Sequence, residues 1–374
     1  MKVALVQCPI FDINKPPLAL GYLAAILLKN HYNVDIFDFN IDLYSKTEEK
    51  NRVFWNFEYV FQWQKNDYFT KEVLLPRAYF KDCAEKIMLC RPDIIGFSSQ
   101  HTSLQASIDL AKEIKNIASD KIIIFGGPAH LSYPIEHVMD LLNFDNGKGI
   151  KIIDIIVLGE GEETLIETLK RIERKETLKG CLGTIFTADG QIINNGLRPL
   201  IHNLDAIPFP EFKGFSHSYN YRNRLPILGS RGCVNRCVFC DDTSIWSGYR
   251  SRSPENIFEE MKLRRREGID FLEFNDLLIN GNLKQLSRLC DLLLREKLDL
   301  IWGGSACIDC RMDLGFLEKL KQAGCFYLNY GIESASPKVL CDMNKNFTIE
   351  EAKKVITDTH KARIDVCTNW LIGF

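Results

Sequence analysis

Three cysteines of this 374-residue chain stand close together in a glycine-rich segment. Cys233, Cys237 and Cys240 follow residues 229–232 (GSRG) with the spacing C-x-x-x-C-x-x-C. Three thiolates on one short loop can bind three irons of a four-iron cluster and leave the fourth iron open to another ligand. A structural zinc site needs a fourth ligand and usually C-x-x-C pairs, so zinc binding and plain core packing are the weaker interpretations. The spacing therefore predicts an iron-sulfur cluster with one reactive iron.

Small and polar residues follow the strand-like runs in the first half of the chain. These residues are Ser98, Ser99, Gly126, Gly127, Gly159, Glu160, Gly161 and Glu162. Ligands of doubly wound sheets bind at the carboxyl ends of the strands, where glycines let a large ligand approach the backbone and hydroxyls supply hydrogen bonds. Tight turns also need glycine, so spacing alone leaves a ligand site and ordinary turns both open.

The elements that must position these residues alternate between strand and helix. Continuous apolar runs such as residues 121–125 (KIIIF) indicate strands buried on both faces, which predicts a doubly wound parallel sheet over residues 1–180. The expected strands are 2–7, 33–39, 93–98, 121–125 and 154–158, and the expected helices are 17–29, 103–118 and 163–174. An aromatic-rich insertion at about 42–75 is expected to be a helical lid or an ordinary packing segment.

A change in the sequence pattern, from alternating strands and helices to a hairpin and a linker, marks the expected domain boundary. Residues 181–224 contain a hairpin pattern at 183–195 and a linker with three prolines. Alternation of strand and helix then resumes over 225–374, which predicts a partial β/α (TIM-like) barrel. The expected strands are 271–274, 300–304, 326–332 and 366–374, and the expected helices are 254–267, with Ser253 as N-cap, 283–296, 314–323 and 349–362. Because the last strand-like run reaches the end of the sequence, we expect a barrel truncated at its C-terminus.

Composition and net charge indicate which kinds of partner this chain binds. The 47 basic and 49 acidic residues nearly cancel, so no global field indicates nucleic acid or an anionic membrane, and we expect a small-molecule substrate. No window approaches the roughly 18 consecutive apolar residues of a membrane span. Thirteen cysteines, an odd number, fit a reducing cytoplasm better than a set of paired disulfides.

The cysteine loop resembles the signature of the radical S-adenosylmethionine (SAM) superfamily, in its spacing and in Phe239 before the last cysteine. Residues 249–255 (YRSRSPE) resemble the stretch after the cluster in the cobalamin-dependent branch, and the glycine loops with residues 16–18 (PPL) resemble its cobalamin-binding domain. The resemblance covers essentially the whole chain. It implies a Rossmann-like cobalamin domain before a radical SAM barrel, with a 4Fe-4S cluster, SAM and cobalamin as cofactors. It also implies a reductant such as flavodoxin or ferredoxin.

Further SAM contacts are implied by position within the resemblance. Asp276 stands where the family receives the SAM amino group, although the usual Gly-Gly-Glu is absent, and a solvated or capping aspartate is the alternative. Glu333 ends the fourth barrel strand, where a carboxylate can accept hydrogen bonds from both ribose hydroxyls. Cys307 and Cys310 form a bare C-x-x-C, for which ordinary packing is weighed against an auxiliary metal or redox site.

The loop after the first strand departs from a pattern common among cobalamin proteins. Many of them coordinate cobalt through the histidine of a D-x-H-x-x-G loop, whereas residues 11–17 here (FDINKPP) contain no histidine. The resemblance therefore implies cobalamin without a histidine ligand on cobalt. His101 and His130 lie in other loops and are expected to be surface or hydrogen-bonded residues.

The preferred activity is methyl transfer to an unactivated carbon, or less often phosphorus, of a small molecule or of a natural-product or lipid intermediate. A cyclisation or rearrangement with the same cofactors is the alternative, and sequence does not separate the two. Methylthiolation of tRNA would require a second cluster, which the cysteines of the first half do not resemble. A non-enzymatic metal-binding module would be a colourless zinc protein.

Overall fold

The chain folds into two compact units, each of which is described separately. The computed structural model describes residues 1–59, 78–132, 134–215, 219, 223–242, 246 and 248–373. One unit comprises Met1–Ile201 with Ile207–Arg222, and the other comprises His202–Ala206 with Asn223–Phe374. Part of the aromatic-rich insertion expected at 42–75 lies outside the described residues. Among the described residues, no helix is long and apolar enough to cross a membrane.

The first unit is built on a seven-stranded sheet in the order β2-β1-β3-β4-β5-β6-β7. The strands are β1 Lys2–Gln7, β2 Asn33–Asp38, β3 Ile94–Ser98, β4 Ile122–Gly126, β5 Ile155–Val157, β6 Thr184–Ala188 and β7 Gln191–Asn194. The first five strands pair in parallel, whereas β6 and β7 pair antiparallel. The hairpin between the expected domains therefore extends this sheet at its β5 edge.

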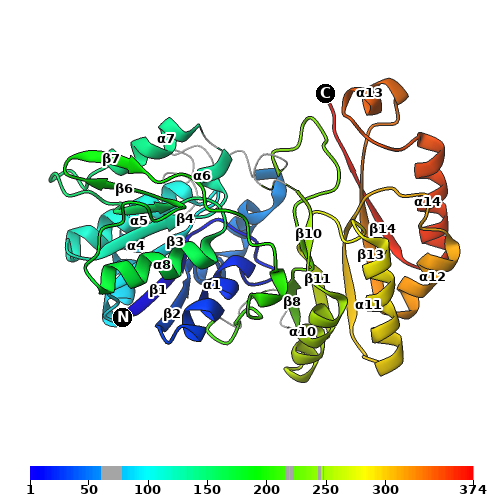
Figure 1. Cartoon of the computed structure of the whole chain (residues 1–374), viewed down its shortest axis with the longest axis horizontal. Helices are drawn as coiled ribbons and strands as arrows, with labels where there is room; N and C mark the ends of the chain where they lie inside the picture. The colour runs from blue at the N-terminus through cyan, green and yellow to red at the C-terminus, as the bar shows by residue number, and fades with distance from the viewer. Residues whose placement is uncertain are drawn as a thin grey trace. The chain divides into compact units, whose positions relative to one another are not determined.

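Helices cover both faces of this sheet (Figure 1). They are α1 Leu18–Lys29, α2 Phe39–Lys46, α4 Ala78–Leu89, α5 Leu104–Ile117, α6 Ala129–Ser132, α7 Ile135–Asp140 and α8 Gly161–Glu173, with short 3-10 turns η1 Glu49–Trp55, η2 Phe57–Tyr59 and η4 Leu141–Asn143. Side chains of β1 alternate between two cores: Ala4 and Val6 pack with α4 and α5, and Val3 and Leu5 pack with α1 and α8. The alternation confirms the predicted burial on both faces.

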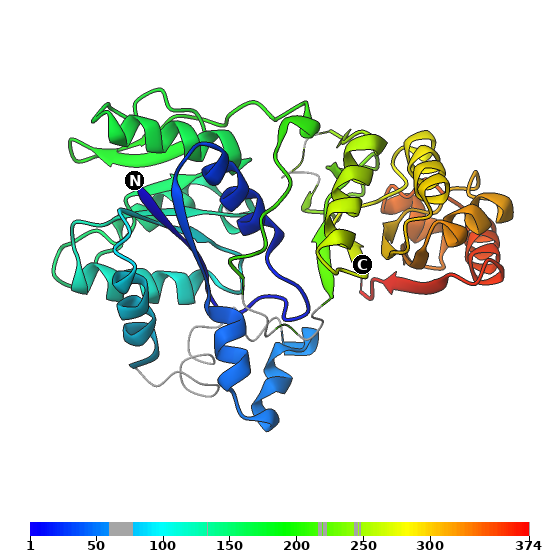
Figure 2. The same cartoon turned by 90° about the horizontal axis from the view of Figure 1, so that it is seen from below.

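The second unit is an open sheet of five parallel strands in the order β14-β13-β12-β11-β8. The strands are β8 Arg224–Ile227, β11 Phe271–Phe274, β12 Ile301–Ala306, β13 Cys325–Glu333 and β14 Asp365–Trp370, and a separate two-stranded ribbon joins β9 Ser230–Arg231 to β10 Arg250–Ser251. The helices are α10 Pro254–Arg266, α11 Leu283–Glu296, α12 Leu314–Gln322, α13 Pro337–Asp342 and α14 Ile349–Lys361, after a short turn η5 Leu204–Ala206. Figures 1 and 2 show the helices flanking the sheet. The partial β/α barrel is confirmed.

The helix ends show why the sequence folds this way locally. Ser253 accepts a hydrogen bond from the backbone of Asn256 at the start of α10, as predicted, and Pro254 follows it at the first helical position. Thr348 and Glu351 form a capping box at the start of α14. These caps satisfy backbone N–H groups that the first turn of a helix leaves without partners. The helices consequently begin at fixed residues and hold the strand ends in place.

Candidate active site

The cysteine loop follows β8 and lies at the carboxyl end of the barrel strands. Its entry is fixed by the ribbon of β9 with β10 and by Gly232, which has a φ of 80°. A Cβ at Gly232 would collide with the carbonyl oxygen of Gly248, so only glycine fits this close approach of two backbones. Gly232, in the glycine-rich sequence before the cysteines, therefore lets the chain turn where it passes close to the backbone just before β10.

The three cysteine thiols lie partly exposed near one another. The backbone N–H of Asn235 donates to Sγ of Cys233 at 3.3 Å. Burial raises the pKa of Cys233, and the neighbouring thiolates of Cys237 and Cys240 raise it further. Within the described ranges, no three side chains of His, Cys, Asp or Glu converge on a position for a single metal ion. A four-iron cluster does not require that convergence, because each thiolate binds a different iron. The three thiols fit such a cluster.

The far side of the loop is held by the segment after α13. The N–H of Val238 donates to the carbonyl of Met343 at 3.2 Å, and the side-chain amide of Asn344 donates to the carbonyl of Arg236 at 2.7 Å. The ammonium of Lys345 lies 5.4 Å from the centre of the Phe239 ring, the residue singled out before the last cysteine. These contacts fix the middle of the loop, and the close backbone approach at Gly232 fixes its entry.

Glu333 stands at the end of β13 in the left-handed region, with a φ of 66°. Its Oε1 lies 3.2 Å from Nζ of Lys345, which also donates to the carbonyl of Gly331 at 3.1 Å. Burial raises the pKa of Cys237, the charge of Lys345 lowers it, and that of Glu333 raises it, so both charges act on this thiol. The structure thus brings Glu333 to the cysteine loop, and its contact with ribose stays a prediction.

Glu333→Ala is expected to weaken SAM binding by about 1.5–3 kcal/mol, since a carboxylate acceptor would be lost from the ribose hydroxyls. The dissociation constant of SAM, measured on protein with normal iron content, checks this value. Glu350→Ala, which removes an exposed glutamate at the start of α14, is the matched control and should bind SAM normally. An unchanged affinity in Glu333→Ala would assign the residue to the ion pair with Lys345 alone.

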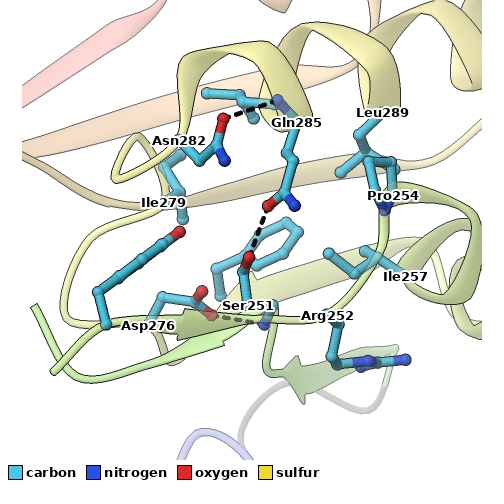
Figure 3. A pocket seen from close by; sticks show the side chains of 13 residues that line it. Ser251, Arg252, Pro254, Ile257, Asp276, Ile279, Asn282, Gln285 and Leu289 are labelled. Atoms are coloured by element: carbon cyan, nitrogen blue, oxygen red, sulfur yellow. Dashed lines mark hydrogen bonds between the residues drawn. The ribbon is translucent and has the colours of Figure 1, made fainter. Parts of the chain in front are cut away.

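Asp276 supports the start of the cysteine loop. Its Oδ1 accepts from the N–H of Gly229 at 2.7 Å, and its Oδ2 accepts from the hydroxyl of Ser230 at 2.5 Å. Burial raises the pKa of Asp276 to about 7, while these two hydrogen bonds lower it. Figure 3 shows its carboxylate directed at the loop backbone. The sequence did not indicate this bracing role, because the partners lie 46 and 47 residues away.

A small pocket adjoins Asp276 between β10, β11 and the helices α10 and α11 (Figure 3). Its polar side chains have partners: the hydroxyl of Ser251 donates to Oε1 of Gln285 at 2.5 Å, and Oδ1 of Asn282 accepts from the backbone N–H of Gln285 at 3.2 Å. Apolar groups of Ile257 and Leu289 complete the lining. Because these polar groups already have partners, the pocket serves as packing behind the loop.

Asp276→Ala is expected to lower the free energy of unfolding by about 1–3 kcal/mol, since the buried N–H of Gly229 would lose its acceptor and the Ser230 hydroxyl would keep only its 3.5 Å contact with the carbonyl of Leu278. Asp276→Asn should retain most of the stability, because its amide can bond to both groups. Denaturant titration of both variants checks the difference, with the 96%-exposed position Asp299→Ala as control. If Asp276→Asn and Asp276→Ala lower the free energy of unfolding equally, the bracing role is contradicted. Weaker SAM binding in an Asp276→Asn variant of normal stability would support the predicted contact with the SAM amino group.

The second cysteine pair is only partly near the loop. The N–H of Cys307 donates to Oδ1 of Asn280 at 3.0 Å, and the thiol lies close enough to Cys233 for that thiolate to raise its pKa, after burial and Asp309. Cys310 is exposed. Ordinary packing and an auxiliary metal or redox site both stay predictions for this pair.

In the first unit, the serine and glycine loops meet at the carboxyl ends of β3 and β4. The N–H of Ser99 donates to the carbonyl of Gly126 at 2.7 Å, and Ser98 ends β3. Gly127 has a φ of 109°, and a Cβ there would collide with the carbonyl oxygen of Ser99. The hydroxyl of Ser99 is buried and has no hydrogen-bond partner among the described residues. The close contact of the two loops requires glycine at position 127, and binding of the nucleotide tail of cobalamin at these loops stays a prediction.

The third predicted loop leads into α8. Gly159 has a φ of 79°, Gly161 is the first residue of the helix, and Glu162 is buried in its first turn. Oε2 of Glu160 accepts from the N–H of Ile201 at 2.6 Å. Glu160 therefore anchors the strand-to-helix turn to the segment after the hairpin, a role that its sequence position did not indicate.

The histidine-free loop after β1 is organised by a residue that the sequence did not single out. The fully buried Asn40 accepts from the N–H of Phe11 at 3.0 Å and donates to the carbonyls of Phe11 and Asp12 at 3.2 and 3.1 Å. It also accepts from the indole N–H of Trp55 at 2.9 Å. The expectation that His130 is a surface or hydrogen-bonded residue was wrong: it is buried, and neither ring nitrogen has a partner among the described residues.

Comparison with known proteins places this arrangement in a family. Residues 227–374 match the radical SAM superfamily. An uncharacterised methyltransferase of Pyrococcus horikoshii is 30% identical over 390 residues, covering all of this chain and 74% of that protein. An anaerobic magnesium-protoporphyrin IX monomethyl ester cyclase of Cereibacter sphaeroides is 26% identical over 321 residues, covering 82% of this chain and 50% of the cyclase. The chain thus spans three quarters of the first relative and half of the second.

A solved structure shares the fold of both units. The radical SAM methyltransferase TsrM of Kitasatospora setae, with cobalamin and a [4Fe-4S] cluster bound, superposes with a TM-score of 0.75 over all of this chain and 69% of TsrM, at 17% identity. The relative at 30% identity and the superfamily match over the barrel show that the chain belongs to the radical SAM superfamily, and the shared architecture shows the two-unit fold of a member that binds cobalamin.

Proposed function

We propose that this protein is a methyltransferase that binds a 4Fe-4S cluster, SAM and cobalamin and methylates an unactivated carbon, or less often phosphorus, of a small molecule. The observation that carries the proposal is the presence of two ligand arrangements in one chain. The barrel unit presents Cys233, Cys237 and Cys240 on one loop, and the Rossmann-like unit brings the loops of Ser99 and Gly127 together at its strand ends. Relatives named as methyltransferases support this reaction.

Some residues of this chain would hold the cluster and SAM, and others fix the conformation of the loop that presents them. The three cysteines would bind three irons and leave the fourth to SAM, and Glu333 would accept hydrogen bonds from the ribose. Asp276 keeps the loop in one conformation by accepting from Gly229 and Ser230, which pre-organises the open iron position. When bound, the cluster supplies the electron for reductive SAM cleavage, and cobalamin supplies the methyl-carrying chemistry.

The products formed from SAM test the proposed reaction. Anaerobic protein with reductant, cobalamin and SAM should form S-adenosylhomocysteine, which records loss of a methyl group, as well as 5′-deoxyadenosine, which records reductive cleavage. Protein prepared without cobalamin is the control and should form little S-adenosylhomocysteine. Formation of 5′-deoxyadenosine alone, with cobalamin bound, would contradict methyl transfer.

The same measurement addresses the second candidate function. A cyclase among the relatives matches 82% of this chain, so a cyclisation or rearrangement with the same cofactors is the alternative. Such a reaction needs the radical but no methyl group. It would therefore give 5′-deoxyadenosine without S-adenosylhomocysteine, which is the pattern that contradicts the methyltransferase.

The reaction needs an electron donor and a reducing compartment. We infer that a flavodoxin or ferredoxin supplies the electron and that the protein acts in the cytoplasm. All thirteen cysteines, each within the described ranges, are free thiols, which supports this inference.

A further inference from the structure

Three exposed side chains form the outer face of the cysteine loop. Exposure alternates along residues 233–238: Val234, Arg236 and Val238 are exposed, whereas Cys233 and Cys237 are partly buried. The exposed fraction is 48% for Val234 and 64% for Val238. Each of the three residues is the sequence neighbour of a cysteine, and consecutive Cα atoms lie about 3.8 Å apart. A molecule that contacts this outer face therefore comes within one residue of the cysteines.

Arg236 gives the outer face a positive charge. It is the one charged residue between Cys233 and Cys240. Its guanidinium donates to two carbonyls of its own loop at 3.2 and 3.3 Å, and no carboxylate that the structure describes forms an ion pair with it. The nearby ammonium of Lys345, in contrast, is paired with Glu333 at 3.2 Å. The charge of Arg236 is therefore available to a partner in solution.

Two exposed aspartates flank this positive charge. Asp241 follows the last cysteine of the loop, and Asp342 ends α13, next to the residue whose carbonyl accepts from the N–H of Val238. A central positive charge between two negative ones favours a partner whose carboxylates meet Arg236, and it disfavours displaced orientations of that partner. The pattern of charge thus specifies both the sign of the partner and its position.

We propose that the outer face, formed by Val234, Arg236 and Val238, is the docking surface for the protein that delivers the electron, and that this carrier presents carboxylates to Arg236. The proposal rests on the proposed function, which requires reductive SAM cleavage. The carrier loses one electron and the cluster gains it, and no atom or proton is transferred. Electron transfer slows steeply with distance, and weak redox encounters use small interfaces with an apolar centre and a polar rim. Two valines around one arginine, within one residue of the cysteines, fit such an encounter.

A purified flavodoxin serves as the probe. Its dissociation constant should be measured by calorimetry on the iron-loaded protein, for the wild type, Arg236→Glu and Asp342→Asn. Arg295→Glu is the matched control, because this exposed arginine lies in the last turn of α11, which returns the chain to the opposite end of the barrel strands. Asp342→Asn lies outside the loop and keeps the test valid if Arg236→Glu loses its iron.

Rates of 5′-deoxyadenosine formation give a second readout. They should be measured with reduced flavodoxin and with titanium(III) citrate, a small reductant that needs no docking surface. The ratio of the two rates corrects for any change in the cluster itself.

Arg236→Glu should weaken flavodoxin binding about 3- to 10-fold, the range for reversing an exposed charge at an interface, and Asp342→Asn should tighten it about 2-fold. Binding by the wild type should weaken as salt is raised, and binding by Arg236→Glu should respond less. The ratio of the flavodoxin-driven rate to the chemically driven rate should follow the affinity. Arg295→Glu should match the wild type.

The docking surface is overturned if the wild type does not bind flavodoxin, if Arg236→Glu and Asp342→Asn bind it as the wild type does, or if Arg295→Glu loses as much affinity as Arg236→Glu. It is also overturned if Arg236→Glu changes the sedimentation coefficient of the protein alone and not flavodoxin binding, since the face would then join two copies of this chain. Wild-type protein that forms no 5′-deoxyadenosine with either reductant would overturn the proposed function, whereas the affinities would still decide the docking surface.

Discussion

Simultaneous replacement of Cys233, Cys237 and Cys240 by Ala is expected to abolish both the bound cluster and the reductive cleavage of SAM. Each thiolate holds a different iron, so the triple variant has no protein ligand left for a cluster on this loop. Iron content and the formation of 5′-deoxyadenosine from SAM, both measured anaerobically, check the result. The expected change is complete loss, the largest effect that any substitution in the barrel unit should have.

The double variant Cys307→Ala with Cys310→Ala is the matched control, because it removes thiols from a neighbouring loop of the same unit. It should keep its iron and its SAM cleavage. Retention of about four irons per chain by the triple variant would refute the assignment of the cluster to this loop.

Gly127→Val is expected to remove most of the bound cobalamin and leave the cluster in place. A valine there must adopt a φ near 109°, a conformation that costs of order 1–3 kcal/mol, and its Cβ collides with the backbone of Ser99. The loops after β3 and β4 must therefore move relative to one another, which would displace the backbone that is predicted to contact the nucleotide tail. Cobalt content after reconstitution with cobalamin measures the effect, and iron content shows whether the barrel unit is intact.

Gly190→Val provides the control for backbone strain. Gly190 lies in the turn between β6 and β7, has a φ of 74°, and has open space around its Cβ position. This variant carries similar strain but leaves the loops at β3 and β4 unchanged, so it should retain cobalamin. Normal cobalt content in a folded Gly127→Val would contradict the placement of the tail.

Local patterns predicted the elements that are strongly apolar or well capped. The strands β1 and β11 begin and end at the expected residues, because each apolar run is bounded by polar or turn-forming residues. The helix α10 begins where Ser253 and Pro254 indicated. The short helices α2 and α13 were not predicted, since one or two turns produce too little periodicity to distinguish them from loops.

Contacts between segments far apart in the chain explain the features that local sequence patterns did not predict. The hairpin at 183–195 looked like a connector, yet pairing of β6 with β5 makes it part of the first sheet. Strand pairing is set by distant partners, which a local pattern does not record. The bracing by Asp276 and the burial of His130 have the same origin, because each depends on a segment from elsewhere in its unit. The cysteine loop could be predicted as a cluster site from the sequence because its three cysteines lie within eight consecutive residues.

The metal content of anaerobically purified protein, produced with abundant cobalamin, tests the central claim most directly. A cobalamin-dependent radical SAM enzyme should contain about four irons and one cobalt per chain. Elemental analysis measures both in one sample. Zinc in place of iron would contradict the cluster, and full iron occupancy with no cobalt would contradict the cobalamin-binding role of the Rossmann-like unit.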